Sequence, residues 1–462
     1  MSKLKVCLIY PRFKYISGDP PMGVTYLASY LKKYCPGIEV FIIDTTFANP
    51  LKHVFAYLEK NKPDILGVYA DCTMVDRAVS IADWAGARNI PVIFGGPQPT
   101  VDPEYFIAHA DIVVRGEAEY VLKEIIEHWS QDNLQHIAGI WRKKRGEVIK
   151  NPTNYNFLEL DTLPFPAREL LPMGRYIYNW SYLDAVDIGK RGTTMIVSRG
   201  CPFSCSYCQP TLRQMFGNRV RLRSPGNVVA EILALEERYG IGGIFFHDDT
   251  LTADHHWLNE FCRTLLEEKM PVFWGCNSRV DTVNESILKN MYAAGLRVIH
   301  FGIESGSQRI LDEIFNKKII LDQSRSAVSL AKKIGIHAMG FFMLGAPTET
   351  AKEINQTVSF ARSLRLDEAS FSLTTPLIGT DLHRMLVNSD KLKTQYQITP
   401  GYLDYYSRYA LRGGLHPWCI KFFQLKAILF FYLHPFRFRY IMGHIFTLRG
   451  YRKLLNKIRR FF

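Results

Sequence analysis

The sequence predicts an α/β protein with two successive sets of parallel strands and a basic, helical C-terminal region. Short apolar runs alternate with helix-length segments up to residue 129, and the same alternation resumes at residue 193. Three cysteines lie within eight residues directly after the first strand of the second set. Nearly all of the net positive charge lies beyond residue 404. These observations divide the chain into an N-terminal domain, a connecting segment, a second domain and a tail.

The N-terminal domain, residues 1–135, is predicted to form a doubly wound sheet. Its expected strands are the apolar runs at 6–10, 39–44, 64–69, 91–96 and 111–116. Helix-length segments lie near 22–34, 50–61, 73–88 and 117–129. Such alternation indicates parallel strands joined by crossover helices, and ligands bind outside the carboxyl ends of strands in these sheets. Several runs end in glycine, which allows close approach of a large ligand, although an ordinary βα turn explains any single glycine equally well.

Residues 136–192 are predicted to be a hairpin followed by a linker. The hairpin is expected at 138–150, with Arg145 and Gly146 at its turn, and several prolines then indicate an irregular segment.

The second domain, residues 193–385, is predicted to contain six βα units. Its strands are expected near 193–198, 243–248, 271–277, 297–304, 336–344 and 368–375. Residues 386–462 are predicted to form a basic amphipathic helical C-terminal region.

Cys201, Cys205 and Cys208 form a C-x3-C-x2-C motif in the loop after the strand at 193–198. Three thiolates can hold three irons of a [4Fe–4S] cluster, and the fourth iron would then be open to bind a substrate. A zinc site or three buried thiols are the alternatives. Structural zinc normally takes four ligands, and no nearby Cys or His supplies an obvious fourth. The motif therefore favours an iron–sulfur cluster.

With Tyr207 as the aromatic residue, this motif resembles the cluster loop of the radical S-adenosylmethionine (radical SAM) superfamily. The resemblance implies that the open iron binds S-adenosyl-L-methionine (SAM) and that the reduced cluster cleaves it to a 5′-deoxyadenosyl radical. The six βα units resemble the superfamily's partial (β/α)6 barrel, a partial TIM barrel open on one side. The three cysteines would then be both the metal ligands and the catalytic residues.

The strand ends of the second domain resemble the SAM-binding segments of the same superfamily. The resemblance implies that Asp248 or Asp249 accepts hydrogen bonds from the SAM ammonium group and that Arg279 pairs with the carboxylate. Glu304 would bind the ribose hydroxyls. The full implied set of SAM-binding residues is Tyr207, Asp248, Asp249, Arg279, Glu304, Ser305 and Glu349. A helix cap for the aspartates, a surface salt bridge for the arginine and a helix N-terminal charge for the last glutamate remain alternatives.

The N-terminal domain resembles the Rossmann-like cobalamin-binding domain that precedes one branch of radical SAM enzymes. Gln98 stands where His is common, and Ala118 stands where Gly is common. The segment after Asp44 has no cobalt-ligating histidine, so the resemblance implies cobalamin bound without that lower axial ligand, and the loop 69–73 would face the cobalt. The implied cobalamin-binding residues are Gly23, Asp44, Thr73, Gly95, Gly96, Gln98, Thr100, Gly116 and Glu117.

The charge of the chain is concentrated in its tail. Of the formal net charge of +13, twelve Lys or Arg residues without any Asp or Glu lie between 405 and 462, which leaves about +1 for the rest (13 − 12). Apolar residues recur with helical spacing near the C-terminus, at Tyr451, Leu454, Leu455, Ile458 and Phe461. The pattern is compatible with peripheral binding to anionic lipid or with a helical layer packed on the barrel. A nucleic-acid partner is not expected, because no binding fold with interleaved aromatics is evident.

Compartment and activity follow from these expectations. No secretory signal is evident, and nine cysteines favour a reducing compartment, so the protein is expected in the cytoplasm, with membrane contact at the inner face as one reading. The resemblance implies a methyltransferase that methylates an unactivated carbon of a hydrophobic lipid or tetrapyrrole pigment precursor. It also implies a one-electron reductant such as flavodoxin or ferredoxin. The alternatives are a cyclising, ring-contracting or oxidising enzyme without methyl transfer, and a non-catalytic cobalamin-binding sensor.

Overall fold

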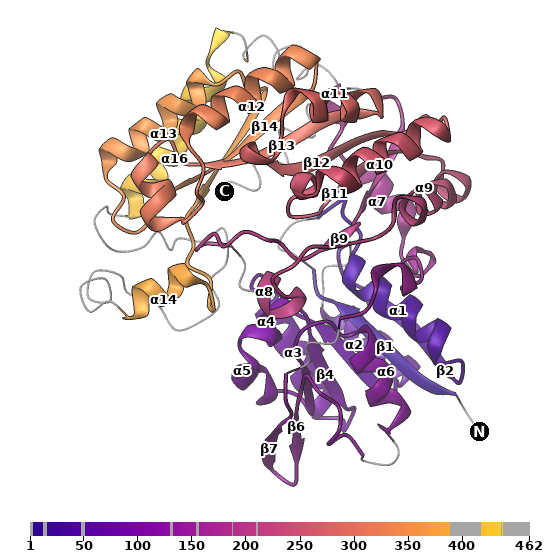
Figure 1. Ribbon diagram of the computed structural model, residues 1–462. Coiled ribbons are helices and arrows are strands. Elements are labelled where there is room, and N and C mark those ends of the chain that lie inside the picture. The colour runs from indigo at the N-terminus through magenta and orange to yellow at the C-terminus, as the bar shows by residue number, and fades with distance from the viewer. Residues whose placement is uncertain are drawn as a thin grey trace. The chain divides into compact units, whose positions relative to one another are not determined.

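The computed structural model describes residues 3–12, 16–47, 51–129, 133–153, 157–186, 188–208, 211–388, 417–435 and 437. The chain divides into two compact units, which are described separately below (Figure 1). The first unit contains residues 1–181, 191–202 and 209–241, and the second contains residues 182–190, 203–208 and 242–462. Within the described residues, no helix is both long enough and apolar enough to cross a bilayer. The amphipathic pattern expected at 451–461 lies outside the described residues.

The first unit is built around a seven-stranded sheet with the order β2-β1-β3-β4-β5-β6-β7. The first five strands pair in parallel, as the alternating sequence pattern predicts, and they end at the same edge of the sheet. The last two strands pair antiparallel, so the hairpin extends the sheet beyond β5. The strands are β1 (Leu4–Tyr10), β2 (Ile38–Asp44), β3 (Ile65–Tyr69), β4 (Val92–Gly95), β5 (Ile112–Val114), β6 (Ile140–Lys144) and β7 (Glu147–Lys150).

Helices of the first unit such as α1 (Met22–Tyr34) and α6 (Glu119–Glu127) pack on this sheet through apolar residues. In α1, for example, Val24, Ala28 and Leu31 recur at helical spacing and join the core with Val6 and Leu8 of β1. The other helices of the unit are α2 (Leu51–Asn61), α3 (Val75–Gly86), α4 (Pro97–Val101), α5 (Pro103–Ile107), α7 (Met173–Asn179), α8 (Thr211–Phe216) and α9 (Pro225–Tyr239).

A buried ionic network fixes α9 within the first unit. The carboxylate of Glu231 lies between the guanidinium groups of Arg168 and Arg223, at 3.1 Å and 2.5 Å. Arg168 also donates a hydrogen bond to the carbonyl oxygen of Thr194, at 2.9 Å. All three charged side chains are at most 4% exposed, so each charge depends on its partners for solvation.

The second sheet has six strands in the order β15-β14-β13-β12-β11-β8. Neighbours in this sheet follow one another in the sequence, and the pairings from β11 to β15 are parallel, as expected for a half-barrel of βα units. The strands are β8 (Arg191–Met195), β11 (Ile241–Phe246), β12 (Phe273–Arg279), β13 (Leu296–Glu304), β14 (His337–Leu344) and β15 (Glu368–Leu373). The strand expected at 193–198 ends at Met195, and the short β9 (Ser198–Arg199) then pairs antiparallel with β10 (Arg221–Leu222).

Helices follow most strands of the second sheet. The π-helical turn η7 (Ile310–Ile314) precedes the longer helix that follows β13. Residues Thr350 and Glu353 form a capping box that starts α13 directly after the turn that ends β14. The helices are α10 (His255–Glu267), α11 (Glu285–Ala293), α12 (Leu321–Ile334), α13 (Ala351–Ser363), α14 (Asp381–Asn388) and α16 (Pro417–Tyr432).

The C-terminal helix α16 packs on β15. The side-chain amide of Gln424 donates to the carbonyl oxygen of Phe371, at 2.7 Å, and the hydroxyl of Tyr432 donates to the carbonyl oxygen of Ala369, at 3.0 Å. The buried guanidinium of Arg437 donates to the carbonyl oxygen of Leu366, at 2.9 Å. This part of the tail therefore forms a layer on the sheet, which was one of the two expectations for the region.

Candidate active site

The cysteine motif lies in an irregular loop directly after β9. Cys201, Cys205 and Cys208 are partly exposed, and none of them forms a disulfide. Next to Cys201, Gly200 has φ +92°, and a Cβ atom there would collide with the carbonyl oxygen of Arg219. Only glycine fits this position without strain. The division between the two units falls inside the loop, after Pro202.

The segment Phe203–Cys208 is held by contacts within the second unit. The backbone N–H of Ser206 donates to the carbonyl oxygen of Phe315, at 2.9 Å, and its hydroxyl donates to the carbonyl oxygen of Ile314. The side-chain amide of Asn316 donates to the carbonyl oxygen of Ser204, at 2.9 Å. The backbone that carries Cys205 and Cys208 is therefore fixed to residues 314–316, at the end of the π-helical turn η7.

The chemistry of the donor set fits an iron–sulfur cluster. Three partly exposed thiols lie close together in the sequence, and thiolates are the usual ligands of such clusters. Other cysteines of the chain differ, because burial raises the pKa of the Cys7 and Cys276 thiols and raises that of Cys262 to about 12. Buried thiols of that kind are unreactive, whereas the partly exposed thiols of the motif are accessible to bind metal.

Arg279, the last residue of β12, contacts the cysteine loop. Its Nη1 donates to the Sγ atom of Cys205, at 3.4 Å, and its guanidinium lies 3.8 Å from the ring centre of Phe203. Nε and Nη2 form a paired contact with Asp281, at 2.9 and 2.8 Å, and Nη2 also donates to the carbonyl oxygen of Lys317, at 2.8 Å. These contacts use four of the five N–H donors of the side chain, so one remains for a ligand. Because Arg279 is buried, its pairing with Asp281 is not a surface salt bridge.

Glu304, Tyr207 and Lys317 form a buried polar group. Glu304 ends β13 with φ +68°, and its Oε1 atom accepts hydrogen bonds from Lys317, at 2.9 Å, and from the hydroxyl of Tyr207, at 3.0 Å. Lys317 also donates to the Tyr207 oxygen, at 3.0 Å. Burial raises the pKa of Tyr207 well above its usual value, and the charge of Glu304 adds to this effect. Both contacts use Oε1, so within the described part of the chain the Oε2 atom of Glu304 is the oxygen available to a ligand.

Lys317 was not expected from the sequence. It lies 13 residues after Glu304 and 110 residues after Tyr207, in a stretch without a recognisable motif. Ser305 was expected to bind SAM, and the structure shows its hydroxyl in a buried contact with the hydroxyl of Thr357, at 3.1 Å. Ser305 therefore fixes the turn after β13 to α13.

Asp248 and Asp249 follow β11. Asp248 is buried, whereas Asp249 is exposed. Desolvation by the surrounding protein is the larger cause that raises the pKa of Asp249, and the negative charge of Asp248 adds to it. Because the side chain is exposed, solvent weakens both effects. The cap of α10 is Asp254, whose carboxylate accepts from the backbone N–H of Trp257, at 3.0 Å. Neither Asp248 nor Asp249 has that role.

Glu349 lies in the turn between β14 and α13. Its Oε2 atom accepts hydrogen bonds from the backbone N–H groups of Gly345 and Ala346, at 2.6 and 2.9 Å. Its Oε1 atom is buried and has no hydrogen-bond partner among the described residues. Burial raises the pKa of Glu349 to about 7. The first turn of α13 already contains Glu353, so the helix does not depend on Glu349 for an N-terminal charge.

Most of the residues expected to bind cobalamin follow the carboxyl ends of β2, β3, β4 and β5 in the first unit. Asp44, at the end of β2, accepts from the hydroxyl of Tyr176, at 2.6 Å, and Thr73 donates from its backbone and hydroxyl groups to Asp71, at 2.8 and 2.6 Å. Gly23 lies in the first turn of α1, and a Cβ atom there would meet no other atom within 4 Å.

The segment after β4 is tightly packed on one side and open on the other. Gly96 has φ +106°, and a Cβ atom there would lie 2.9 Å from both the Ala70 carbonyl oxygen and the Tyr69 ring, whereas one at Gly95 would meet nothing within 4 Å. The hydroxyl of Thr100 donates to the Gly96 carbonyl oxygen, at 2.8 Å. The backbone here can approach a large flat ligand closely, which fits cobalamin.

Three further expected residues, Gln98, Gly116 and Glu117, form contacts with neighbouring segments. The Thr100 hydroxyl accepts from the backbone N–H of Gly116, at 3.1 Å, and buried Gln98 donates its backbone N–H to the Ala70 carbonyl oxygen, also at 3.1 Å. Glu117 pairs with Arg199, at 3.3 Å, and with Arg221. Burial raises the pKa of Glu117, although both arginines oppose this. Its carboxylate is therefore engaged within the protein.

Comparisons with known proteins identify the family of each of the two main parts of the chain. The family model described as Radical SAM superfamily matches residues 195–361, and the model described as B12 binding domain matches residues 19–126. An uncharacterized methyltransferase of Pyrococcus horikoshii is 35% identical over 408 residues, which cover 85% of each chain. The chain belongs to the cobalamin-dependent radical SAM methyltransferase family. The predicted fold class is thereby confirmed, as are the enzyme class and the cofactors: a [4Fe–4S] cluster, SAM and cobalamin.

Other relatives of this radical SAM methyltransferase have different activities in their names. A cytidylyl-2-hydroxyethylphosphonate methyltransferase of Streptomyces wedmorensis is 27% identical over 82% of this chain and 80% of the relative. An anaerobic magnesium-protoporphyrin IX monomethyl ester cyclase of Rubrivivax gelatinosus is 29% identical over 83% of this chain and 70% of the relative. The family therefore does not by itself define the substrate.

Two solved structures share the fold. The radical SAM methyltransferase TsrM of Kitasatospora setae, solved with cobalamin and a [4Fe–4S] cluster, has a TM-score of 0.69 at 18% identity, covering 84% of this chain and 75% of that one. The cobalamin-dependent radical SAM enzyme OxsB, solved with aqua-cobalamin and SAM, has a TM-score of 0.75 at 17% identity, covering 99% of this chain and 71% of that one.

Proposed function

We propose that this enzyme methylates an unactivated carbon of a hydrophobic small molecule, of the lipid or tetrapyrrole-precursor class. The observation that carries the proposal is the contact of the cysteine loop with two strand ends of the half-barrel. Arg279 contacts Cys205, and Tyr207 contacts Glu304. A cluster ligand therefore lies beside residues suited to bind SAM, in a chain that also has a cobalamin-binding domain.

When bound, the cluster and SAM supply the one-electron chemistry that removes a substrate hydrogen, and cobalamin supplies the methyl group. In the proposal Cys201, Cys205 and Cys208 hold the cluster. Exposed Asp249, with Asp248 beside it, accepts from the SAM ammonium group. A carboxylate of SAM would receive a single hydrogen bond from Arg279, since the other four donors are used within the protein.

The remaining SAM contacts are proposed from the free atoms at the strand ends. The Oε2 atom of Glu304 would accept from the ribose, while Lys317 and Tyr207 hold the other carboxylate oxygen. The buried Oε1 atom of Glu349 would take a polar group on the adenine or substrate side. Ser305 supports the turn that carries Glu304.

The proposed cobalamin site is the carboxyl edge of the first sheet. The glycines among its residues allow close approach, and the polar side chains order the loops that surround the ligand. Its proposed members are Gly23, Asp44, Thr73, Gly95, Gly96, Gln98, Thr100, Gly116 and Glu117. We further propose a one-electron reductant such as flavodoxin or ferredoxin, because the cluster must be reduced before each cleavage of SAM.

A cyclisation or oxidation without methyl transfer is the second candidate. It is favoured by the relative that is named as a magnesium-protoporphyrin ester cyclase. Product mass separates the two candidates, since methylation adds the mass of one methylene group and cyclisation by oxidation removes hydrogens. In a non-catalytic cobalamin sensor, the variant Cys201→Ala should leave cobalamin binding unchanged. In an enzyme, the same variant should lose turnover.

The first test is a cofactor census on protein purified without oxygen from cobalamin-supplied cells. The proposal expects about four irons and one cobalt per chain, with the iron lost in the triple Cys201→Ala, Cys205→Ala, Cys208→Ala variant. Incubation with SAM, reductant and a panel of hydrophobic metabolites should then yield a methylated product. Zinc in place of iron would contradict the proposal, and so would products that gain no carbon.

We also propose that the C-terminal region binds an anionic lipid surface. Trp418, Phe422, Leu425 and Leu429 recur at helical spacing on α16 and are between 43% and 76% exposed. The segment 405–462 has twelve basic residues and no acidic ones, which complements anionic headgroups. Full-length protein should sediment with phosphatidylglycerol vesicles and be released by high salt. Equal sedimentation with neutral vesicles, or none with either, would contradict the proposal.

A further inference from the structure

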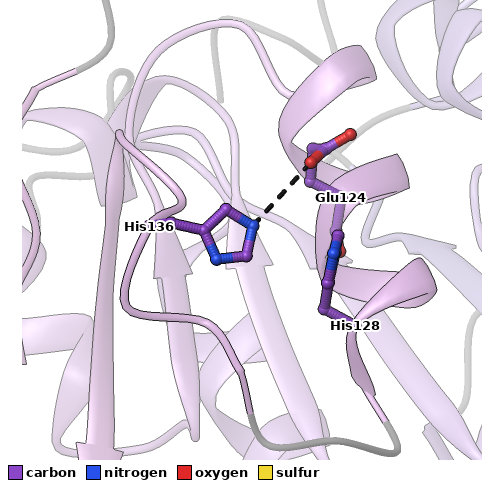
Figure 2. Close-up of side chains that lie close together, drawn as sticks. All are labelled: Glu124, His128 and His136. Atoms are coloured by element: carbon purple, nitrogen blue, oxygen red, sulfur yellow. Dashed lines mark hydrogen bonds and ion pairs between the residues drawn. The ribbon is translucent and has the colours of Figure 1, made fainter.

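Glu124, His128 and His136 lie close together in the first unit (Figure 2). Glu124 and His128 are one helical turn apart on α6 and its C-terminal cap, and His136 lies in the segment that leads to β6. Because α6 follows β5 and runs back along the sheet, its C-terminal end is opposite the carboxyl edge described above. The reaction proposed for this enzyme does not use these residues.

The three side chains bring together two imidazoles and a carboxylate. Their ligand atoms all lie within 4.8 Å of one another, and Glu124 Oε2 is 4.0 Å from His136 Nε2. The two imidazole rings are 4.6 Å apart at 74°. In tetrahedral zinc sites with bonds of about 2.0–2.1 Å, neighbouring ligand atoms are about 3.4 Å apart. Small side-chain rotations would therefore close the group around an ion.

The tautomer of His128 is suited to metal binding. Its Nδ1 atom lies 3.0 Å from the backbone carbonyl oxygen of Glu124. A carbonyl oxygen only accepts hydrogen bonds, so Nδ1 carries the proton and Nε2 keeps a lone pair. Metal-bound histidines commonly donate their other N–H to a carbonyl or carboxylate in this way. This hydrogen bond is independent of the distances between the three ligands.

The surroundings leave the group accessible. Lys123 contacts Glu124 Oε1, at 3.1 Å, so Oε2 is the oxygen that faces His136. The side chain of Glu124 is 15% exposed and that of His136 is 45% exposed. An ion from solvent can therefore reach the group through His136, while the nearby ammonium group limits the affinity.

We propose that Glu124, His128 and His136 bind a Zn²⁺ ion, with water as the fourth ligand. Two imidazoles and one carboxylate suit zinc, and the ion would join the C-terminal end of α6 to the segment before β6. Since metal binding to the native state stabilises it, zinc should also raise the thermal midpoint of the protein.

The test uses full-length protein with its iron–sulfur cluster intact and Zn²⁺ alone as the probe. Competition with a chromophoric chelator should reveal one zinc per chain bound outside the cluster. His128→Ala and His136→Ala should each weaken binding at least tenfold and abolish the zinc-induced rise in thermal midpoint. The matched control is His109→Ala, whose histidine pairs with Asp83 on the same unit, at 2.7 Å, and which should bind zinc as the wild type does.

A second variant keeps the test informative if a histidine variant is unstable. Glu124→Gln preserves the backbone carbonyl and the side-chain shape but removes the anionic ligand, so it should also weaken zinc binding. X-ray absorption should show nitrogen and oxygen ligands without sulfur. Unchanged affinity in these variants would overturn the proposal, as would sulfur in the zinc shell, because the zinc would then be on the cysteines.

Discussion

The guanidinium of Arg279 donates a hydrogen bond to the Sγ atom of Cys205, at 3.4 Å, while its other edge pairs with Asp281. The arginine therefore offers a positive charge to one thiol of the cysteine motif from a rigid position at the end of β12. Hydrogen bonds and charge around the sulfurs are among the means by which proteins tune iron–sulfur clusters. This hydrogen bond connects the end of β12 directly to the cysteine loop.

We expect Arg279→Met to weaken the retention of the cluster and the turnover of the enzyme. A hydrogen bond to a charged group contributes about 1.5–3 kcal/mol, which corresponds to about a 10- to 150-fold loss. Iron content after anaerobic gel filtration and product formation measure the effect. Arg263→Met is the control, because Arg263 is exposed and, among the described residues, pairs with Glu267 on its own helix. Equal iron and turnover in both variants would exclude the supporting role.

We expect Lys317→Met to destabilise the second unit, because it leaves the buried carboxylate of Glu304 without its positive partner. Breaking a buried pair in this way costs about 3–5 kcal/mol. The exposed neighbour offers a matched control, Lys318→Met, which should leave the thermal midpoint unchanged. Adding Glu304→Gln to Lys317→Met should recover much of the stability without recovering SAM affinity. Recovery of both would show that Glu304 does not contact SAM.

The raised pKa of Glu349 predicts a specific pH dependence of stability. The folded protein holds this proton up to about pH 7, whereas the unfolded chain releases it near pH 4.5. The stabilising contribution is therefore full below pH 4.5 and is lost as the pH rises to 7. Glu349→Gln should raise the thermal midpoint at pH 8, by an amount equivalent to about 3 kcal/mol, and have little effect at pH 4.5.

Glu353, in the first turn of α13, gives the opposite case. Hydrogen bonds from Arg309 hold its pKa down to about 2, so its contribution is full above pH 4.5 and is lost as the pH falls toward 2. Glu353→Gln should therefore lower the thermal midpoint at pH 8. If the two glutamine variants shifted the midpoint in the same direction at pH 8, the environments described for these carboxyl groups would be wrong.

Alanine variants of two adjacent glycines, Gly95 and Gly96, should affect different properties of the first unit: the first ligand binding and the second stability. Gly96→Ala should cost about 2 kcal/mol or more, because its φ of +106° and its 2.9 Å contacts leave no room for a Cβ atom. Gly95→Ala should leave the thermal midpoint unchanged but weaken cobalamin binding, since the open space at Gly95 is where the ligand is proposed. Cobalt content and visible absorption measure the binding. Gly37→Ala, also in open space but in the loop before β2, should change neither property.

Much of the fold could be predicted because its signals are local. Apolar runs of strand length alternate with amphipathic helices, and the cysteine spacing is contained in eight residues. Register and partner choice are not local. The hairpin β6-β7 extends the first sheet because β6 pairs with β5, from Val114 with Ile140 to Ile112 with Arg142, and no turn signal indicates that pairing.

The candidate site was predictable only in part. The positions of Asp248 and Asp249 after β11 and of Glu304 at the end of β13 could be predicted from the strand pattern, whereas the contacts of buried Lys317 could not, because its partners are distant in the sequence. The same holds for Glu231, which is buried between Arg168 and Arg223 and looks like an ordinary helix-surface residue in the sequence. Contacts across long sequence separations require the fold before they can be inferred.

The packing of α16 on β15 has a consequence for the edge of the half-barrel. β15 is the terminal strand of an open sheet, and such an edge offers unpaired backbone groups on which another chain can add a strand. Gln424 and Tyr432 donate hydrogen bonds to backbone carbonyl oxygens of that edge, and Arg437 donates one to a carbonyl oxygen just before it. A chain that ended after α14 would therefore expose a template for intermolecular β-pairing. In this protein the helix that follows the barrel also protects it from self-association.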